Sequence, residues 1–386
     1  MAKKNIAVMD FGSNHITVLI GERGVNGTFD VRGYAESSYA GFLNGEILEP
    51  ENLSEALCTA INTAQNNARV KITDLYIGVP GEFSLNEVKS VSKDYGKSKK
   101  ITTREIEELF LMGDDFGASP THIVVNRSPV CFELDNGERV IDPKGESTTI
   151  LSATLSFMLA ERTFVGTVLQ AVGGMNIPYV DFISEPLAEC MYLLSPEERD
   201  NSAILIDCGY LSTTVSVVVG DGLVCMRSFA LGGGHIVADI CEMLSVPFPV
   251  AVEIKKKALL AGKPSETEQL TVECGGKSWT VSALAVYQIV ERKLGQIAKM
   301  INKSLSSCEY ERPQNIRLNL TGGGISYIKG VREKLFELLG KDVIVREPKI
   351  PLMNEPRKSA VLGLLDLALN TRKANYGLMC KIFKKK

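Results

Sequence analysis

The stretch IAVMDFGSNHITVLIG, residues 6–21, reads as two apolar strands joined by a turn that contains Asp10 and Gly12. A glycine at such a turn lets backbone N–H groups come close to a ligand, and Asp10 places a carboxylate at the same point. A carboxylate repels phosphate unless a cation lies between them. The turn therefore predicts half of a phosphate site that also needs a metal ion.

The same pattern returns later in the chain, in SAILIDCGYLSTTVSVVVGDGLVCMRSFALGG, residues 202–233. Asp207 and Gly209 match Asp10 and Gly12, as an internal duplication would produce. Two similar domains that face each other would enclose a cleft. Because both acids would lie beside phosphates, the pair predicts Mg²⁺ held by Asp10 and Asp207.

A third glycine turn lies in LNLTGGGISYIKGVREKL, residues 318–335, where a strand is followed by three glycines and a helix start. Such a turn can present its backbone to a nucleotide. A single turn of this kind is typical of a plain structural turn, but three in this order favour a nucleotide site. CGGKS, residues 274–278, is not a P-loop, since Thr271 stands where that motif needs glycine, and it predicts a hairpin turn.

Composition narrows the class of protein. The chain has 386 residues, of which 45% are hydrophobic and 23% charged, with a net charge of −3, so no global positive field favours nucleic acid as a partner. Nine cysteines are scattered singly, which predicts reduced thiols without disulfides. MAKKN leads directly into a strand and no run of ~18 apolar residues occurs. We therefore expect a cytoplasmic protein.

Periodicity predicts an α/β organisation with an inserted subdomain at 84–162. Strands are expected at 5–11, 15–21, 28–38, 72–79 and 177–184, with helices at 51–69 and 160–174. Within the insertion we expect strands near 84–93, 121–133 and 147–157 around one helix at 102–117.

Five segments resemble, in order and spacing, the motifs of the actin, sugar-kinase and heat-shock ATPase superfamily: MDFGSNHITVLIG, ISEPLAECMYLL, LIDCGYLSTTVSVV, LNLTGGGISYIKG and SAVLGLLDLAL. Within it the chain resembles the FtsA family, notably in GFLNGEILEPENLSEAL, FELDNGERVIDPKGE and ALGGGHIVADICEML. The resemblance implies an actin-like α/β fold, with two duplicated ribonuclease-H-like domains around a nucleotide cleft and the inserted subdomain 1C of FtsA.

The resemblance also implies domain boundaries. Subdomain 1A would comprise residues 1–83, 163–197 and 357–372; 1C, residues 84–162; 2A, residues 198–229 and 311–356; 2B, residues 230–310; and a C-terminal membrane-targeting tail, residues 373–386.

Site residues follow from the same resemblance. ATP would contact Gly12, Ser13, Asn14, His15, Gly209, Ser212, Thr213, Gly232, Gly233, Glu253, Lys256, Gly322, Gly323, Gly324 and Ser326, with Glu185 and Asp207 as catalytic groups. By an alternative interpretation, Glu185 only caps its helix beside Pro186, and Glu253 and Lys256 lie on a solvated helix face. The chain departs from the family at His15, at Leu211 and at Thr214, which stands where an acid is common. We therefore expect at most a slow ATPase.

The function implied is that of a polymer-forming actin homologue that tethers the FtsZ ring to the inner face of the cell membrane at the division site. Partners would be the FtsZ C-terminal peptide, further copies of the chain, other division proteins and anionic lipid. An FtsA-like paralogue or a pilus-assembly actin homologue remains an alternative. A small-molecule kinase is disfavoured, because no catalytic base for a hydroxyl substrate is visible.

Two further surfaces are predicted. Arg292, Lys293, Lys299 and Asn302, on a helix expected at 282–305, would bind the FtsZ peptide, although a solvated helix face would look the same. The tail NYGLMCKIFKKK, residues 375–386, has amphipathic helix periodicity, with the alternative of a frayed basic terminus. Its membrane-binding residues would be Leu378, Met379, Ile382, Phe383, Lys381, Lys384 and Lys385.

Overall fold

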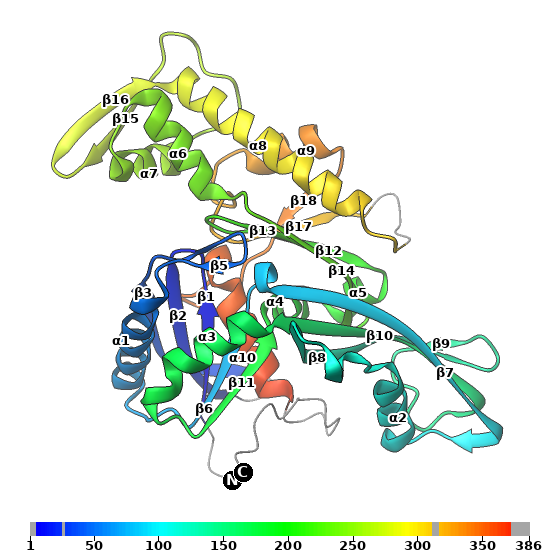
Figure 1. Ribbon diagram of the computed structural model, residues 1–386. Helices are drawn as coiled ribbons and strands as arrows, with labels where there is room; N and C mark the ends of the chain where they lie inside the picture. Colours follow the sequence, from blue (N-terminus) through cyan, green and yellow to red (C-terminus); the bar gives the residue numbers. More distant parts are fainter. Residues whose placement is uncertain (1–4, 25–27, 311–315, 372–386) are drawn as a thin grey trace. The chain divides into compact units, whose positions relative to one another are not determined.

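The computed structural model describes residues 5–24, 28–310 and 316–371, and the chain divides into two compact units (Figure 1). Unit 1 holds the described residues up to Ala203 together with Ser216–Met226 and the chain from Ala360 onward. Unit 2 holds Ile204–Val215 and Arg227–Ser359. Each unit is described by itself.

The opening stretch forms the centre of a five-stranded sheet in unit 1, in the order β11-β6-β1-β2-β3. Strand β1 pairs antiparallel with β2 and parallel with β6, which in turn pairs parallel with β11. All six residues of β1 are buried, as its continuous apolar run predicts. The bounds are β1 Ile6–Phe11, β2 His15–Arg23, β3 Phe29–Ser38, β6 Asp74–Val79 and β11 Tyr179–Ser184.

Helices cover both faces of this sheet, and glycines allow their close approach. A Cβ on Gly33 would lie 2.5 Å from the carbonyl oxygen of Ala64, in helix α1 (Pro50–Ala68). A Cβ on Gly21 would lie 2.5 Å from Leu365, in helix α10 (Ser359–Thr371). Gly33 pairs with Ile20, the neighbour of Gly21, so the two helices lie on opposite faces. The smaller elements of unit 1 are β4 Phe42–Leu43, β5 Glu46–Ile47, η1 Gly81–Phe83, α3 Arg162–Val172, η3 Gly173–Met175, α4 Glu185–Leu193 and α5 Pro196–Asp200.

The insertion, residues 84–162, has a sheet in the order β7-β10-β8-β9 and its own hydrophobic cluster, which includes Phe110, Phe132 and Phe157. Its elements are β7 Ser84–Lys100, α2 Thr103–Gly113, η2 Phe116–Ala118, β8 His122–Leu134, β9 Arg139–Val140 and β10 Ser147–Glu161. The expected helix at 102–117 ends earlier, at Gly113. Strand β7 runs further than expected because β10 pairs with it as far as Lys100.

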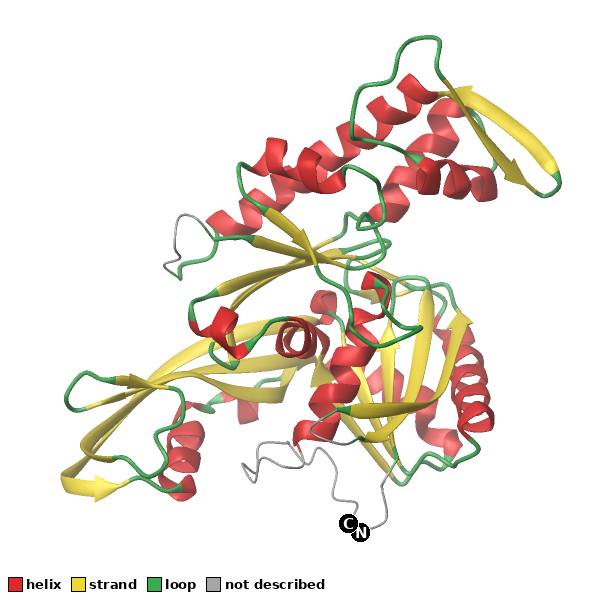
Figure 2. Ribbon diagram, turned by 180° about the vertical axis from the view of Figure 1, so that it is seen from behind, coloured by secondary structure: helices red, strands yellow, loops and turns green. Residues whose placement is uncertain are grey.

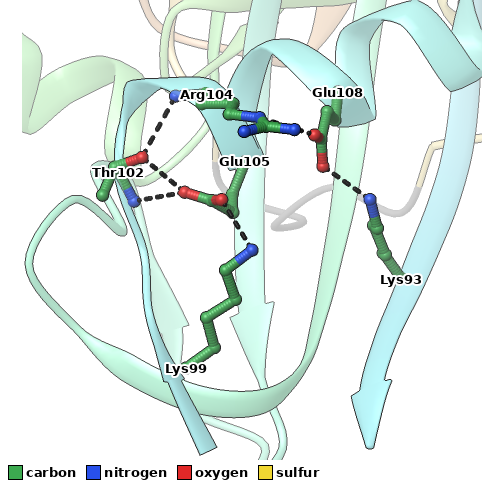
Figure 3. Close-up of polar contacts among 6 residues, drawn as sticks. All are labelled: Lys93, Lys99, Thr102, Arg104, Glu105 and Glu108. Atoms are coloured by element: carbon green, nitrogen blue, oxygen red, sulfur yellow. Dashed lines mark hydrogen bonds and ion pairs between the residues drawn. The ribbon is translucent and has the colours of Figure 1, made fainter.

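A capping box stabilises the first turn of helix α2 (Figure 3). Glu105 accepts a hydrogen bond from the Thr102 backbone N–H at 3.0 Å and pairs with Lys99 at 2.7 Å. The Lys99 ammonium and the Thr102 hydroxyl lower the pKa of Glu105 to about 2. One turn further on, Glu108 pairs with Lys93 at 2.5 Å. These contacts join α2 to the distal part of β7.

Unit 2 contains most of a second five-stranded sheet, in the order β14-β13-β12-β17-β18. In this order, three strands that are consecutive in the sequence, β14, β13 and β12, are followed by two strands that pair in parallel, β17 and β18. The sheet of unit 1 has the same arrangement in the order β3-β2-β1-β6-β11, so the predicted duplication is confirmed. Strands β13 and β14 belong in part to each unit. The bounds are β12 Ala203–Cys208, β13 Thr213–Val219, β14 Gly222–Phe229, β17 Leu318–Thr321 and β18 Val343–Val345.

A helical layer and one hairpin complete unit 2 (Figure 2). Helix α6 packs against α7 and α8, and α7 against β15. Gly275 and Gly276 form the turn between β15 and β16 with φ of +60° and +71°, so the prediction that CGGKS is a hairpin turn is confirmed. The bounds are α6 Gly233–Leu244, α7 Phe248–Lys257, β15 Gln269–Cys274, β16 Lys277–Ser282, α8 Ala283–Ser306, α9 Val331–Leu339 and η4 Pro356–Lys358.

Replacing Glu105 with alanine should fray α2, because the variant loses both the capping bond to Thr102 and the ion pair with Lys99. We expect a loss of ~1–2 kcal/mol in the local free energy of unfolding, measured by hydrogen exchange over residues 103–113. Since the pKa of Glu105 is lowered, its contribution is present at neutral pH and is lost as the pH falls from ~4.5 through about 2.

Glu107→Ala, on the same helix, is the matched control and should change exchange little. Equal effects of the two substitutions would contradict the role given to Glu105.

Candidate functional site

The second glycine loop follows β12 and carries Asp207 at its start. The backbone N–H of Gly209 donates to the carbonyl oxygen of Ser212 at 2.9 Å, which closes the turn. Asp207 keeps part of its surface exposed, whereas Cys208 beside it is fully buried. The loop thus places a half-buried carboxylate at the end of a buried strand.

Three loops that are distant in the sequence meet backbone to backbone around this turn. Gly233 N–H donates to the carbonyl oxygen of Gly209 at 2.9 Å, and Gly324 N–H donates to that of Cys208 at 2.7 Å. A Cβ on Gly324 would lie 2.1 Å from the Gly209 oxygen, and one on Gly233 would lie 2.1 Å from the Gly324 oxygen. Only glycine fits such distances, so the structure brings the predicted glycines together for a physical reason.

The other predicted glycines of unit 2 are Gly232, Gly322 and Gly323. Gly322 has φ of +86°, and a Cβ there would lie 2.1 Å from Oδ1 of Asp207. Gly232 lies against Gly209, whose oxygen would be 2.5 Å from its Cβ. Gly323 instead faces Cβ of Arg357, at 2.9 Å, and is the member of the predicted set that does not contact the Asp207 loop.

Some of the hydroxyl groups predicted to approach phosphate are already hydrogen-bonded within the protein. Thr213 is buried, and its hydroxyl donates to the carbonyl oxygen of Leu231 at 2.6 Å. Ser326 donates to the carbonyl oxygen of Thr321 at 3.2 Å, within its own loop. Ser212 is half-buried, so its hydroxyl remains the better candidate for contact with a ligand. Sequence alone did not distinguish these positions.

Leu211 and Thr214, two of the three departures from the family pattern, also have defined surroundings. Thr214 is buried, and its hydroxyl lies 3.2 Å from that of Ser228, in strand β14, so it points into the sheet. Leu211 lies half-buried at the tip of the loop. The Thr214 hydroxyl is therefore engaged within the sheet, and slow turnover stays a prediction.

Lys255, which the sequence did not single out, lies against the glycine loops. Its Nζ would be 2.5 Å from a Cβ on Gly233, and burial lowers the pKa of this lysine to about 8. The predicted Lys256 is exposed and pairs with Glu253 at 2.7 Å. A signal existed in the sequence, because Lys255 follows the buried Ala251 by four residues and so shares its helix face.

The first glycine loop, residues 12–15 in unit 1, is held by the segment that follows β3. The hydroxyl of Tyr39 donates to the carbonyl oxygen of Gly12 at 2.9 Å. Gly41 has φ of +91°, and a Cβ there would lie 1.9 Å from the Ser13 oxygen. His15 lies 2.7 Å from Oδ1 of Asn14 through its Nδ1. The loop is therefore a fixed turn whose shape depends on Tyr39 and Gly41.

Three carboxylates surround Tyr39 at one edge of the unit 1 sheet. The pKa of Tyr39 is raised well above its usual value, first by burial and then by Asp10, Glu185 and Glu82. Asp10 lies in β1, Glu82 follows β6, and Glu185 follows β11. These strands are parallel, so their carboxyl ends meet at the same edge. Glu82 was missed, although its place after a parallel strand was a usable signal.

Glu185 starts helix α4 but does not cap it. Ser184 is the N-cap, and its hydroxyl accepts a hydrogen bond from the backbone N–H of Leu187 at 3.3 Å. Glu185 is 8% exposed and lies near Tyr39 instead. The capping interpretation is therefore wrong, while the catalytic role of Glu185 stays a prediction.

The chemistry of Asp207 fits a cation such as Mg²⁺. Its crowded surroundings displace water and raise its pKa to about 6. Magnesium binds through one or two carboxylates and keeps several waters, so a large protein cage is unnecessary. Among the described residues, no three His, Cys, Asp or Glu side chains are grouped to hold a metal ion. Asp10 and Asp207 stand in different units, and their shared role stays a prediction.

On helix α8 the four predicted peptide contacts are not equivalent. Lys293 is 12% exposed and pairs with Asp239 at 3.0 Å, and Arg292 lies 3.3 Å from the same carboxylate. Lys299 and Asn302 are exposed. Lys303, which was not predicted, is also exposed and lies eleven residues after Arg292, on the same side of the helix.

The predicted membrane tail, residues 373–386, lies outside the described residues. Within the part of the chain that is described, no single helix is long and apolar enough to span a membrane. Helices α6 and α7 pass that test only as a pair, and they are bent by 113°.

Replacing Asp207 with asparagine should raise the melting temperature in the absence of metal and nucleotide. A carboxyl group whose pKa is raised by folding stabilises the protein at low pH, and this contribution is lost as the pH rises from ~3.8 through about 6. The gain should therefore be largest at pH 8 and about half as large at pH 5, measured by thermal unfolding. A gain of equal size at both pH values would contradict the shifted pKa.

Known cell-division proteins are similar to this chain in sequence. The family profile described as Cell division protein FtsA matches residues 204–363. Cell division protein FtsA of Bacillus subtilis is 22% identical over 93% of this chain and 82% of its own length. Its counterpart in Pseudomonas aeruginosa is 23% identical over 95% of this chain and 86% of its own length.

Solved structures confirm the fold. A chain of the PilM-PilN type IV pilus biogenesis complex matches with a TM-score of 0.64 at 16% identity, covering 95% of this chain and 98% of that one. MreB5 of Spiroplasma citri bound to AMPPNP matches with a TM-score of 0.58 at 11% identity, covering 96% and 97%. The predicted resemblance is thereby confirmed: this chain is similar to the bacterial cell-division protein FtsA and has an actin-like fold.

Proposed function

We propose that this chain binds ATP with magnesium and acts as an FtsA-like actin homologue in bacterial cell division. The observation that carries the proposal is the meeting of three glycine loops beside Asp207 and Lys255 in unit 2. Sequence relatives named as cell division proteins support the cellular role. The similar MreB5 was solved with AMPPNP, which supports a nucleotide as the ligand class.

Each group near these loops has a chemical role in the proposal. Asp207, when ionised, would hold the cation that neutralises the phosphates. Ser212 would donate a hydroxyl to a phosphate oxygen, and Lys255 would contact the nucleotide beside Gly233. The N–H groups of Gly209, Gly233 and Gly324 are already bonded to backbone oxygens. Those glycines therefore act by allowing close approach rather than by donating to phosphate.

Turnover should be slow or absent. Thr214 is bonded within the sheet and Thr213 donates to a backbone oxygen, so neither activates water. Glu185 is the remaining polar candidate near an attacking water. We expect phosphate release far below the ~1 to 10³ s⁻¹ of typical enzymes.

A matched pair of lysine substitutions tests the nucleotide site. Lys255→Ala should weaken MgATP binding ~10-fold, because it removes the half-buried cation beside Gly233. Lys256→Ala should leave affinity within ~2-fold, since that exposed ammonium pairs only with the half-buried Glu253 in the described contacts. Isothermal calorimetry of the full chain measures both. Absence of MgATP binding to the wild type, or equal affinities of the two variants, would refute the proposal.

We further propose that helix α8 binds the C-terminal peptide of FtsZ from the same organism. Lys299 and Lys303 are exposed on the same side of the helix as Arg292 and can form charge-assisted bonds to an acidic peptide. Arg292 and Lys293 already share the carboxylate of Asp239, so they are weaker candidates.

Reversing the charges of Lys299 and Lys303 together should weaken peptide binding at least ~5-fold in fluorescence polarisation. Lys277→Glu, on the β15–β16 hairpin, reverses an exposed charge elsewhere in unit 2 and should have little effect. If the double variant binds like the wild type, the placement on α8 is wrong.

Polymerisation, binding of anionic lipid through residues 375–386 and location at the inner membrane face complete the proposal. They rest on the sequence resemblance and on the amphipathic pattern of the tail. A pilus-assembly role is the second candidate, favoured by the TM-score of 0.64 to a chain of the PilM-PilN complex. Binding of the FtsZ peptide separates the two.

A further inference from the structure

Strand β13 starts at the second glycine loop and ends at a hairpin that is fixed to the insertion. Thr213, its first residue, follows the loop directly, and Val219, its last, leads into the turn Gly220–Gly222. The loop lies in unit 2, while the turn lies with the insertion in unit 1. Strand β13 therefore joins the candidate nucleotide loop to a separate subdomain.

The hairpin is attached to the insertion by specific contacts. Gly220 has φ of +56°, and a Cβ there would lie 2.4 Å from the carbonyl oxygen of Val130, in β8. The N–H of Asp221 donates to the carbonyl oxygen of Pro129 at 3.2 Å. A Cβ on Gly222 would lie 2.9 Å from Cβ of Ser156, in β10. Backbone contact at these distances leaves little freedom to slide.

Two side chains of the insertion add hydrogen bonds to the next residue of the hairpin. The carbonyl oxygen of Leu223 accepts from the hydroxyl of Ser156 at 2.7 Å and from the amide of Asn86 at 3.0 Å. Asn86 also donates to the Ser156 hydroxyl at 3.1 Å. Ser156 is 1% exposed, so loss of this network would leave a polar group without water.

The strand between these two ends is stiff. Six of the seven residues of β13 are β-branched, every one of the seven is buried, and neither glycine nor proline interrupts it. At its loop end, Thr213 is fixed to the Leu231 carbonyl oxygen. No flexible residue within β13 can therefore absorb a displacement of the loop.

We propose that β13 couples the second glycine loop to the insertion, so that nucleotide bound at the loop changes the insertion through the Gly220–Leu223 hairpin. The inference rests on the proposed nucleotide binding. The conformation of the insertion would then depend on whether nucleotide is bound. By linkage, if nucleotide changes the affinity of the insertion for a partner, that partner changes the affinity for nucleotide by the same factor.

Hydrogen exchange of the full chain, with and without MgATP, tests the coupling. In the wild type, MgATP should slow exchange over the loop, residues 207–214, and also change it over residues 84–92 and 152–160. In Asn86→Ala/Ser156→Ala, the loop should still respond while the response of the insertion falls by more than half. The affinity for MgATP should change ~5-fold in the same variant.

Ser92→Ala/Ser152→Ala is the matched control. These serines lie on the same two strands, β7 and β10, and bond to each other at 2.9 Å without contacting the hairpin. The control should behave like the wild type. A loop response with no change in the wild-type insertion, or an insertion response that survives in the Asn86 and Ser156 variant, overturns the coupling alone. No MgATP binding in calorimetry overturns the proposed function and the coupling together.

Discussion

The contact on which the candidate site depends is the packing of glycine backbones in unit 2. Gly209, Gly233 and Gly324 come from three separate turns, and Gly233 and Gly324 each approach another turn more closely than any side chain permits. The N–H groups of Gly233 and Gly324 are bonded across the turns, and that of Gly209 closes its own turn, so backbone hydrogen bonds hold the arrangement. It fixes the place of Asp207 and creates the surface against which Lys255 packs.

The same sheet architecture appears twice, but the two copies carry different chemistry. The loop in unit 1 is held by Tyr39 and Gly41 and lies near the carboxylates Asp10, Glu82 and Glu185. The loop in unit 2 lies near Lys255. Carboxylates thus gather near the loop of one copy, and a half-buried lysine lies beside the loop of the other.

Much of the fold was predictable, because strands and glycine turns have recognisable local sequence patterns. The duplication was visible in the spacing of Asp10–Gly12 and Asp207–Gly209, and the inserted subdomain in its run of alternating strands. Side-chain direction was harder to predict. Lys255 and Lys256 are neighbours of the same type, and only the helix phase set by Ala251 separates the half-buried one from the exposed one. Likewise, the sequence does not reveal that the Thr213 hydroxyl donates to the Leu231 carbonyl oxygen while its neighbour Ser212 stays half-buried.

The most direct test of the account is MgATP binding by Gly324→Ala, with Gly295→Ala as the control. A Cβ on Gly324 would meet the Gly209 oxygen at 2.1 Å, whereas one on Gly295, in α8, would meet no atom within 4 Å among the described residues. Calorimetry on both full-length variants should show binding abolished by Gly324→Ala and unchanged by Gly295→Ala. Wild-type affinity in folded Gly324→Ala would contradict the claim that the packed glycine loops form the nucleotide site.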